Sequence, residues 1–150
     1  MCGTIVRVDF YQLSRDPAEA ALPLIARAAI KAGERMLVVS ADEAQLGRIG
    51  DALWTRLPES FLAHGMAGDK HPERQPILLS TSTDPANGAR FLALADGQWR
   101  EGDEPFERTF YLFDEANLQG ARDCWRMLGE REGTLRRFWK QQGGKWVEGP

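Results

Sequence analysis

The sequence predicts an α/β fold, a three-layer α/β/α sandwich around a mostly parallel sheet of about five strands. Two observations support this prediction. Short segments of apolar, β-branched and aromatic residues recur along the chain, and segments with helical spacing of apolar residues lie between several of them. Strands that alternate with helices form parallel sheets, and right-handed crossovers place the helices on both faces. With 150 residues, the chain is expected to form one domain with its own core.

The first strand is expected at residues 4–11, where β-branched and aromatic residues predominate. A helix to about residue 32 should follow, because Asp16-Pro17-Ala18-Glu19 provides an N-cap, a first-turn proline and a returning carboxylate. Pro23 lies inside this span, so the pattern leaves open a kink or a later start. Residues 36–40 are almost wholly apolar, which is typical of a strand covered on both faces.

A second capping box, Asp42-Glu43-Ala44-Gln45, predicts a helix that runs to about Trp54. Residues 66–76 are polar and rich in glycine, proline and charge, so we expect a surface loop. The remaining strands are expected at residues 77–81, 91–95 and 109–113. Two helical segments, at about 115–129 and 131–141, complete the prediction, and residues from about 130 to 150 are expected to form a basic helical tail.

Basic residues concentrate near the C-terminus. Residues 121–145 carry seven basic and three acidic side chains, a net charge of +4, whereas residues 1–120 carry 12 basic and 18 acidic ones, a net charge of −6. This asymmetry suggests a local site for an acidic partner. A solvated helix face with internal ion pairs explains the same charges equally well.

The helix predicted at 115–129 contains the candidate binding residues. Its apolar arc consists of Leu118, Ala121, Cys124, Trp125 and Leu128. Trp125 lies at the edge of the arc, and Arg122 and Arg126 lie just outside it. Trp and Arg are the residue types most enriched at binding hot spots. A Trp on an amphipathic helix is also an ordinary core anchor with solvated basic neighbours, and the spacing alone does not separate the two interpretations.

The sequence offers no recognisable reaction centre. The loop after the first strand, Gln12-Leu13-Ser14-Arg15, has no glycine that would let backbone amides hold a phosphate. The only histidines, His64 and His71, flank a glycine-containing loop and are expected to be surface residues rather than metal ligands. We therefore expect no catalytic residue, no metal and no cofactor. A small enzyme or nucleotide binder on the same fold remains the alternative.

The two cysteines, Cys2 and Cys124, do not make a disulfide framework. No apolar run approaches the length of a membrane span, and the first residues lack the regions of a signal peptide. The expectation is a reduced, cytoplasmic protein without a membrane partner.

Short motifs spread over about residues 1–128 carry a family resemblance. They are Val8-Asp9-Phe10-Tyr11, Asp51-Ala52-Leu53-Trp54, Pro58-Glu59-Ser60-Phe61-Leu62-Ala63-His64, Gln75-Pro76-Ile77-Leu78-Leu79, Phe106-Glu107-Arg108, Tyr111-Leu112-Phe113-Asp114, Ala121-Arg122 and Trp125-Arg126. In this order and spacing, they resemble the chi subunit of bacterial DNA polymerase III, a clamp-loader accessory protein.

The resemblance implies a non-catalytic replication adaptor with a fold like a nucleotide-binding domain but without the nucleotide. In that family, chi binds the acidic C-terminal tail of single-stranded-DNA-binding protein, a run of aspartates followed by Ile-Pro-Phe, and links it to the clamp loader. The positions that match the tail-binding motif are Arg122, Trp125 and Arg126. Relatives often carry Tyr and Lys at the last two of these positions.

The resemblance also implies a second surface. Trp54 and Phe61 match residues that contact the psi subunit of the clamp loader, or a DNA-repair helicase that competes for the same place. Packing in the core explains both residues equally well. The family's contact with nucleic acid is then mainly indirect.

A different hypothesis is direct binding of single-stranded nucleic acid by the basic C-terminal segment, with Trp139 and Trp146 stacking on bases. The overall net charge of −3 weighs against it.

Overall fold

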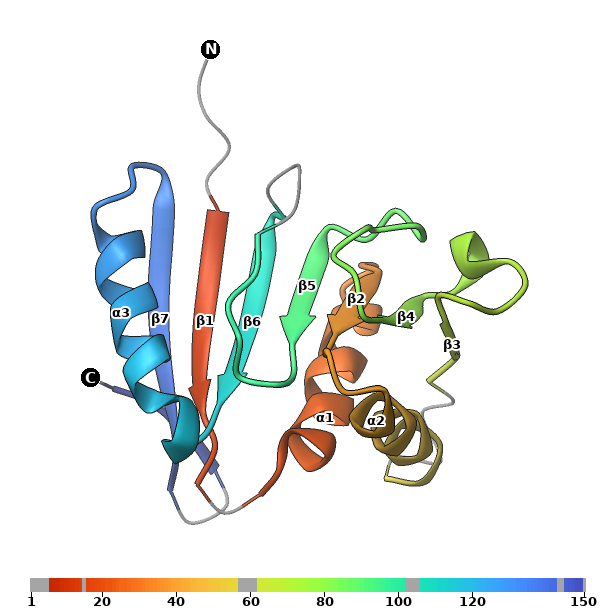
Figure 1. The fold of residues 1–150 in the computed structure, drawn as a ribbon, viewed down its shortest axis with the longest axis horizontal. Helices are drawn as coiled ribbons and strands as arrows, with labels where there is room; N and C mark the ends of the chain where they lie inside the picture. The colour runs from red at the N-terminus through yellow and green to blue at the C-terminus, as the bar shows by residue number, and fades with distance from the viewer. Residues whose placement is uncertain (1–5, 15, 57–61, 102–105, 143–144, 150) are drawn as a thin grey trace.

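The computed structural model describes residues 6–14, 16–56, 62–101, 106–142 and 145–149. Its strands are β1 (Val6–Gln12), β2 (Met36–Val39), β3 (His64–Met66), β4 (Ile77–Ser80), β5 (Phe91–Leu94), β6 (Arg108–Phe113), β7 (Thr134–Gln142) and β8 (Lys145–Glu148). Its helices are α1 (Ala18–Lys31), α2 (Glu43–Thr55) and α3 (Leu118–Gly129), with short 3-10 turns at Pro72–Arg74 and Glu115–Asn117. The strands form one sheet in the order β3-β4-β2-β5-β6-β1-β7-β8 (Figure 1).

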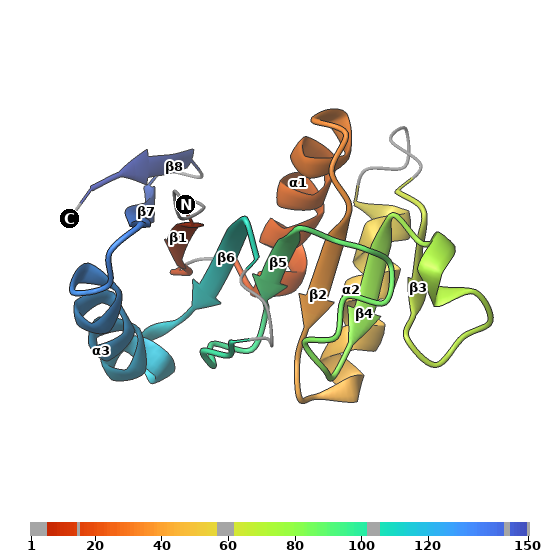
Figure 2. The same ribbon diagram turned by 90° about the horizontal axis from the view of Figure 1, so that it is seen from above.

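The three-layer prediction is confirmed. Neighbouring strands are parallel throughout the described sheet, except that β7 and β8 are antiparallel. Helices α1 and α2 pack on one face, where Phe110 and Leu112 of β6 are buried. Helix α3 packs on the opposite face, against Phe10 of β1 and Tyr111 of β6 (Figure 2). In the described residues the sheet has eight strands rather than about five, because β3, β7 and β8 add to the predicted ones.

Local sequence explains where α2 begins but not where α1 begins. The Asp42 side chain caps α2 by accepting a hydrogen bond from the Ala44 amide at 2.9 Å. The reciprocal bond of the predicted capping box is not made, because the Asp42 amide donates to Ser40 Oγ and the Gln45 side chain bonds to Ser40 and the Ala95 carbonyl. The expected cap at Asp16 is wrong, because Pro17 is the N-cap residue of α1 and no side chain caps this helix. Pro23 neither ends nor delays α1, which continues from Ala18 to Lys31. No helix in the described ranges is long and apolar enough to cross a bilayer.

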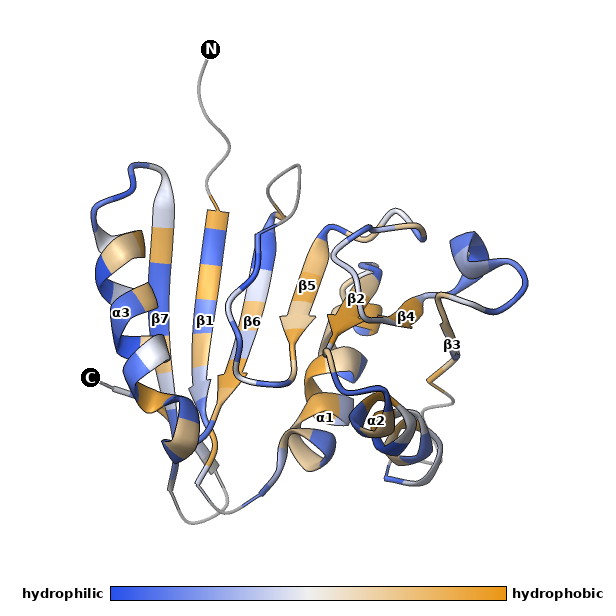
Figure 3. Ribbon diagram, in the orientation of Figure 1, coloured by the Kyte–Doolittle hydropathy of each residue, from blue (hydrophilic) through white to orange (hydrophobic). Residues whose placement is uncertain are grey.

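The helix predicted at 131–141 is wrong, and β7 takes its place. This strand runs parallel to β1 from the pair Val6–Thr134 to the pair Gln12–Lys140. Its Lys, Arg and Gln residues have good helix propensity, but pairing satisfies the backbone groups along the outer side of β1. Figure 3 shows that β7 carries both hydrophilic and hydrophobic residues, in keeping with a strand that contacts different neighbours on its two faces. The basic C-terminal segment is therefore a β-hairpin in its described part, 134–142 and 145–148.

A buried carboxylate links neighbouring strands toward the β8 end of the sheet. Asp9 of β1 is fully buried and accepts hydrogen bonds from Arg7, from Arg108 Nε at 2.7 Å and from Trp139 Nε1 at 3.0 Å. Arg108 belongs to β6 and Trp139 to β7, so one carboxylate links three neighbouring strands. The charge is paired and its oxygens are hydrogen-bonded, as a buried ion requires.

Candidate functional site

Helix α3 presents the predicted binding residues at one end of the sheet. Its apolar side is buried through Ala121, Cys124 and Leu128, so these residues fix the rotation of the helix. Trp125 is partly buried at the rim of this side, while Arg122 and Arg126 are exposed. The structure thus brings the three residues together as the helical spacing predicts.

A pocket of about 320 Å³ lies between α3, β7 and the end of β6. All three predicted residues line it, together with four apolar ones. The complete lining is Phe113, Leu118, Ala121, Arg122, Trp125, Arg126 and Phe138. The pocket therefore has an apolar wall and two guanidinium groups at its border.

Trp125 is held by contacts on several sides. Its ring makes T-shaped contacts with Phe10 and Phe138, with centroid separations of 5.1 Å and 6.0 Å and nearly perpendicular planes. The guanidinium carbon of Arg136 lies 4.2 Å from the Trp125 ring centroid, a cation–π contact. Arg136 Nη1 also donates a hydrogen bond to the Trp125 carbonyl oxygen at 2.7 Å.

The two arginines of the pocket differ in their partners. Arg126 Nη2 lies 2.5 Å from Asp123 Oδ1, and Gln119 donates a hydrogen bond to the same oxygen. Arg122 makes no hydrogen bond or ion pair with any residue that the structure describes. Nothing in the described part of the chain therefore occupies its guanidinium donors, which can bind a carboxylate or phosphate ligand.

This arrangement suits a ligand with an anionic group next to an apolar one. A forked guanidinium binds a carboxylate through two parallel N–H···O bonds. An apolar cavity bounded by an indole accepts an aromatic or large aliphatic side chain.

The second predicted surface lies on a different part of the molecule. Trp54, near the end of α2, is 59% exposed, so the interpretation of this residue as core is wrong. Its ring centroid lies 5.1 Å from that of His64 on β3. Phe61, the other residue predicted for this surface, falls outside the described residues.

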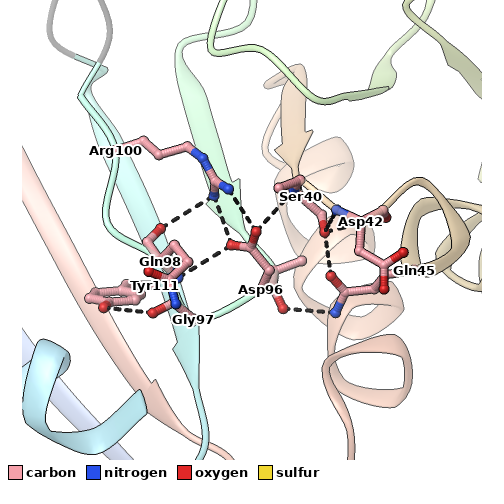
Figure 4. A network of polar contacts seen from close by, with 10 residues as sticks. Ser40, Asp42, Gln45, Asp96, Gly97, Gln98, Arg100 and Tyr111 are labelled. Carbon is pink, nitrogen blue, oxygen red and sulfur yellow. Dashed lines mark hydrogen bonds and ion pairs between the residues drawn. The ribbon is translucent and has the colours of Figure 1, made fainter. Parts of the chain in front are cut away.

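A polar pocket of about 540 Å³ lies at the carboxyl ends of the strands, where nucleotide-binding folds hold their ligands. Figure 4 shows that side chains there bond to one another: Asp96 accepts from Arg100 at 2.6 Å, and Gln45 joins Ser40 to the Ala95 carbonyl. Burial raises the pKa of Asp96, but hydrogen bonds from Arg100 and the Ala41 amide outweigh it and hold the pKa below its usual range. The carboxylates around this pocket belong to Asp16, Glu19, Asp42, Asp96 and Asp114. An acidic lining of this kind disfavours a phosphate ligand.

The histidines and the described cysteine have local roles. His64 Nδ1 is hydrogen-bonded to the Leu62 carbonyl at 2.9 Å, and His71 lies 3.2 Å from Glu73. Within the described residues, no group of three or more His, Cys, Asp or Glu side chains is placed to hold a metal ion. Burial raises the pKa of the Cys124 thiol to about 12, which keeps it protonated and unreactive near neutral pH.

The aromatic residues proposed for base stacking contact Tyr11 instead. The Trp139 ring stacks on Tyr11 at a centroid separation of 6.2 Å, and Trp146 meets the same ring edge-on at 5.0 Å. Both indoles are only partly exposed. Each therefore has contacts within the protein that stacking on a base would have to replace or share.

Sequence reasoning missed Arg136 and Phe138 as parts of this site, because it assigned their segment to a helix. Both residues reach Trp125 because side chains two positions apart on a strand point to the same face, but β7 has no alternation of apolar and polar residues that would have identified it.

Comparison with known proteins gives consistent matches. The family described as "DNA polymerase III chi subunit, HolC" matches residues 5–136. DNA polymerase III subunit chi of Pseudomonas aeruginosa is 31% identical over 132 residues, which cover 85% of this chain and 92% of that protein. DNA polymerase III subunit chi of Escherichia coli K12 is 42% identical over 50 residues, and this match spans only 33% of this chain and 34% of that protein.

Proposed function

Because this chain belongs to the DNA polymerase III chi subunit family, we propose that it is a non-catalytic adaptor for the acidic C-terminal tail of single-stranded-DNA-binding protein. In this proposal the adaptor links that tail to the clamp loader during DNA replication. The observation that carries the proposal is the apolar pocket on α3, with Trp125 in its wall and at its border the guanidinium of Arg122, which has no partner among the described residues.

Each part of such a tail has a complementary group in the pocket. The terminal carboxylate pairs with Arg122, and the phenyl ring of the last residue packs beside Trp125. Arg126 attracts the preceding aspartates. A charge-assisted hydrogen bond contributes roughly 1.5–3 kcal/mol, and burying a Phe side chain contributes about as much. After the cost of ordering a flexible tail, we expect a dissociation constant on the order of micromolar.

The test is a titration with a peptide that ends in Asp-Asp-Asp-Ile-Pro-Phe, followed by fluorescence anisotropy. A free C-terminal carboxylate should be required, so an amidated peptide should bind at least about tenfold more weakly. The Arg122→Ala variant should lose most of the affinity while its thermal unfolding stays close to that of the wild type.

Arg56→Ala is the matched control for that variant, because Arg56 is an exposed arginine on the far side of the sheet, just after α2. It removes the same charge and should bind normally. Equal binding of the free and amidated peptides, or equal affinities of the two variants, would contradict the proposal.

We assign the contact with the clamp loader to the surface around Trp54, either through a psi subunit or through a helicase that takes its place. The exposure of this indole supports the assignment, because Trp is among the residue types most enriched at binding hot spots.

Direct binding of single-stranded nucleic acid has less support. Trp139 donates its indole N–H to Asp9 and stacks on Tyr11, which leaves one face of its ring at most for a base. A bare oligonucleotide in the same titration separates the hypotheses: salt-dependent binding that Arg122→Ala does not change would favour the direct one.

A further inference from the structure

We infer that Arg136 of β7 is a positioning residue for the proposed tail pocket, although it does not line the pocket itself. This inference rests on the proposed function and deepens it. Arg136 sets the orientation of the Trp125 indole. That orientation in turn determines how much the ligand's last side chain contributes to the affinity.

Two contacts fix the Arg136 guanidinium against α3. Its central carbon lies 4.2 Å from the centroid of the Trp125 ring. Its Nη1 donates a 2.7 Å hydrogen bond to the Trp125 carbonyl oxygen. The same group therefore contacts both the side chain and the backbone of Trp125, which determines where the ring lies relative to its own helix turn.

A glycine on α3 makes room for this contact. A Cβ atom at Gly129 would lie 2.7 Å from Arg136 Nη1 and 2.9 Å from its guanidinium carbon. Those distances are too short for non-bonded atoms, so any side chain at position 129 would displace the guanidinium. Glycine also lowers helix stability by about 1 kcal/mol relative to alanine, which makes its presence near the end of α3 consistent with a steric requirement.

The other neighbours of Trp125 do not replace Arg136. Phe10 and Phe138 meet the indole edge-to-face, whereas Arg136 lies over its ring. Removing the guanidinium leaves this side of the ring without support and gives the indole freedom to rotate away from the pocket. Lys would keep the charge but not the planar group that stacks and donates at once.

The neighbouring arginine supplies a matched control. Arg137 follows Arg136 on β7, but its side chain points to the opposite face of the sheet and pairs with Glu148 at 2.7 Å. The variants Arg136→Ala and Arg137→Ala therefore remove the same charge at adjacent positions.

The experiment measures the affinity of these variants for two peptides that end in Ile-Pro-Phe and Ile-Pro-Ala. We expect Arg136→Ala to weaken binding of the Phe peptide by about five- to tenfold, from the loss of a partly buried cation–π contact. Binding of the Ala peptide should hardly change, so the preference for Phe should collapse. Arg137→Ala should keep the wild-type preference, and Arg136→Lys should lie between the two.

Gly129→Ala tests the same inference without removing a charge. It should displace the guanidinium, reduce the preference for Phe as Arg136→Ala does, and add no further loss in the double variant. Because alanine favours the helix, this variant keeps the test decisive if Arg136→Ala unfolds.

The outcomes are distinguishable. If the wild-type protein binds neither peptide, the proposed function fails and this inference fails with it. If the wild type binds and prefers Phe, but Arg136→Ala and Gly129→Ala keep that preference, only the inference is overturned. An equal loss in Arg137→Ala would likewise overturn it, because it would show a general effect of charge.

Discussion

Arg122 and Arg126 lie one turn apart on α3, but among the described residues only Arg126 has an ion-pair partner. Asp123 and Arg126 form an ion pair between exposed side chains, and Gln119 holds the carboxylate on its other side. A ligand carboxylate that approaches Arg126 competes with this internal partner. Arg122 faces no such competition among the described residues, so we expect it to contribute more to binding.

We therefore predict that Asp123→Asn strengthens binding of the acidic tail peptide, by about two- to fourfold, the scale of one exposed ion pair. The substitution frees the Arg126 guanidinium and removes a negative charge next to the pocket. Titration at low and at high salt should show the gain shrinking as salt screens the charges.

Glu130→Gln is the control for this prediction, since Glu130 is an exposed carboxylate just beyond α3 and its substitution changes the net charge equally. An identical gain in both variants would mean that Asp123 acts only through the overall charge and not through its pair with Arg126.

At the scale of elements, the Asp9 carboxylate stabilises the pairing of neighbouring strands, a role that hydrophobic cross-strand pairs have in other sheets. It joins β1 to β6 through Arg108 and to β7 through Trp139. The pairing of β7 with β1 in turn places Arg136 and Phe138 against α3. The wall of the pocket thus depends on a contact on the other face of the sheet.

We predict that Asp9→Asn lowers the free energy of unfolding by about 2–4 kcal/mol, because it leaves two arginines without their shared counter-charge. Urea denaturation followed by circular dichroism measures this loss. Asp114→Asn, at an exposed carboxylate, should change stability by less than about 0.5 kcal/mol. Equal urea midpoints for the two variants would show that Asp9 does not hold the strands together.

The elements differ in how well the sequence predicts them. The sequence predicts the parallel strands of the core from their runs of apolar, β-branched and aromatic residues, and it predicts α3 from its apolar arc. In both cases the local pattern indicates which side chains are buried. β7 is different: its residues Arg136 and Phe138 face α3, while Arg137 and Trp139 face the other side, so apolar and basic residues occur on both faces. Only its partner β1, more than a hundred residues earlier, decides that this segment is a strand. Arg122, Trp125 and Arg126 follow from the local helical pattern, so the sequence predicts them. Arg136 and Phe138, which contact Trp125, depend on the distant pairing of β7 with β1, so the sequence does not predict them.

At the scale of the whole molecule, the two proposed partner surfaces lie toward opposite ends of the sheet (Figure 1). The pocket lies beside β7, and Trp54 of α2 contacts His64 on β3, at the other end of the strand order. A protein that links two others needs surfaces that both can occupy at once, and this separation provides them.

We predict that Trp54→Ala leaves the affinity for the tail peptide unchanged within about twofold, since residues without shared contacts act independently. The same variant should lose capture of the clamp-loader partner, whereas Arg122→Ala should retain it. Surface plasmon resonance with the two ligands added in either order measures both effects. Mutual exclusion of the ligands would contradict a linking role.

The strand order also determines when the protein can fold during its synthesis. β2 pairs with β4 and β5, so that half of the sheet is complete once Leu94 has left the ribosome. β1 is made first but pairs only with β6 and β7, which end at Phe113 and Gln142. A nascent chain must therefore carry β1 without neighbours for most of translation, and its open edges are exposed to chaperones and to other chains until the final strands emerge.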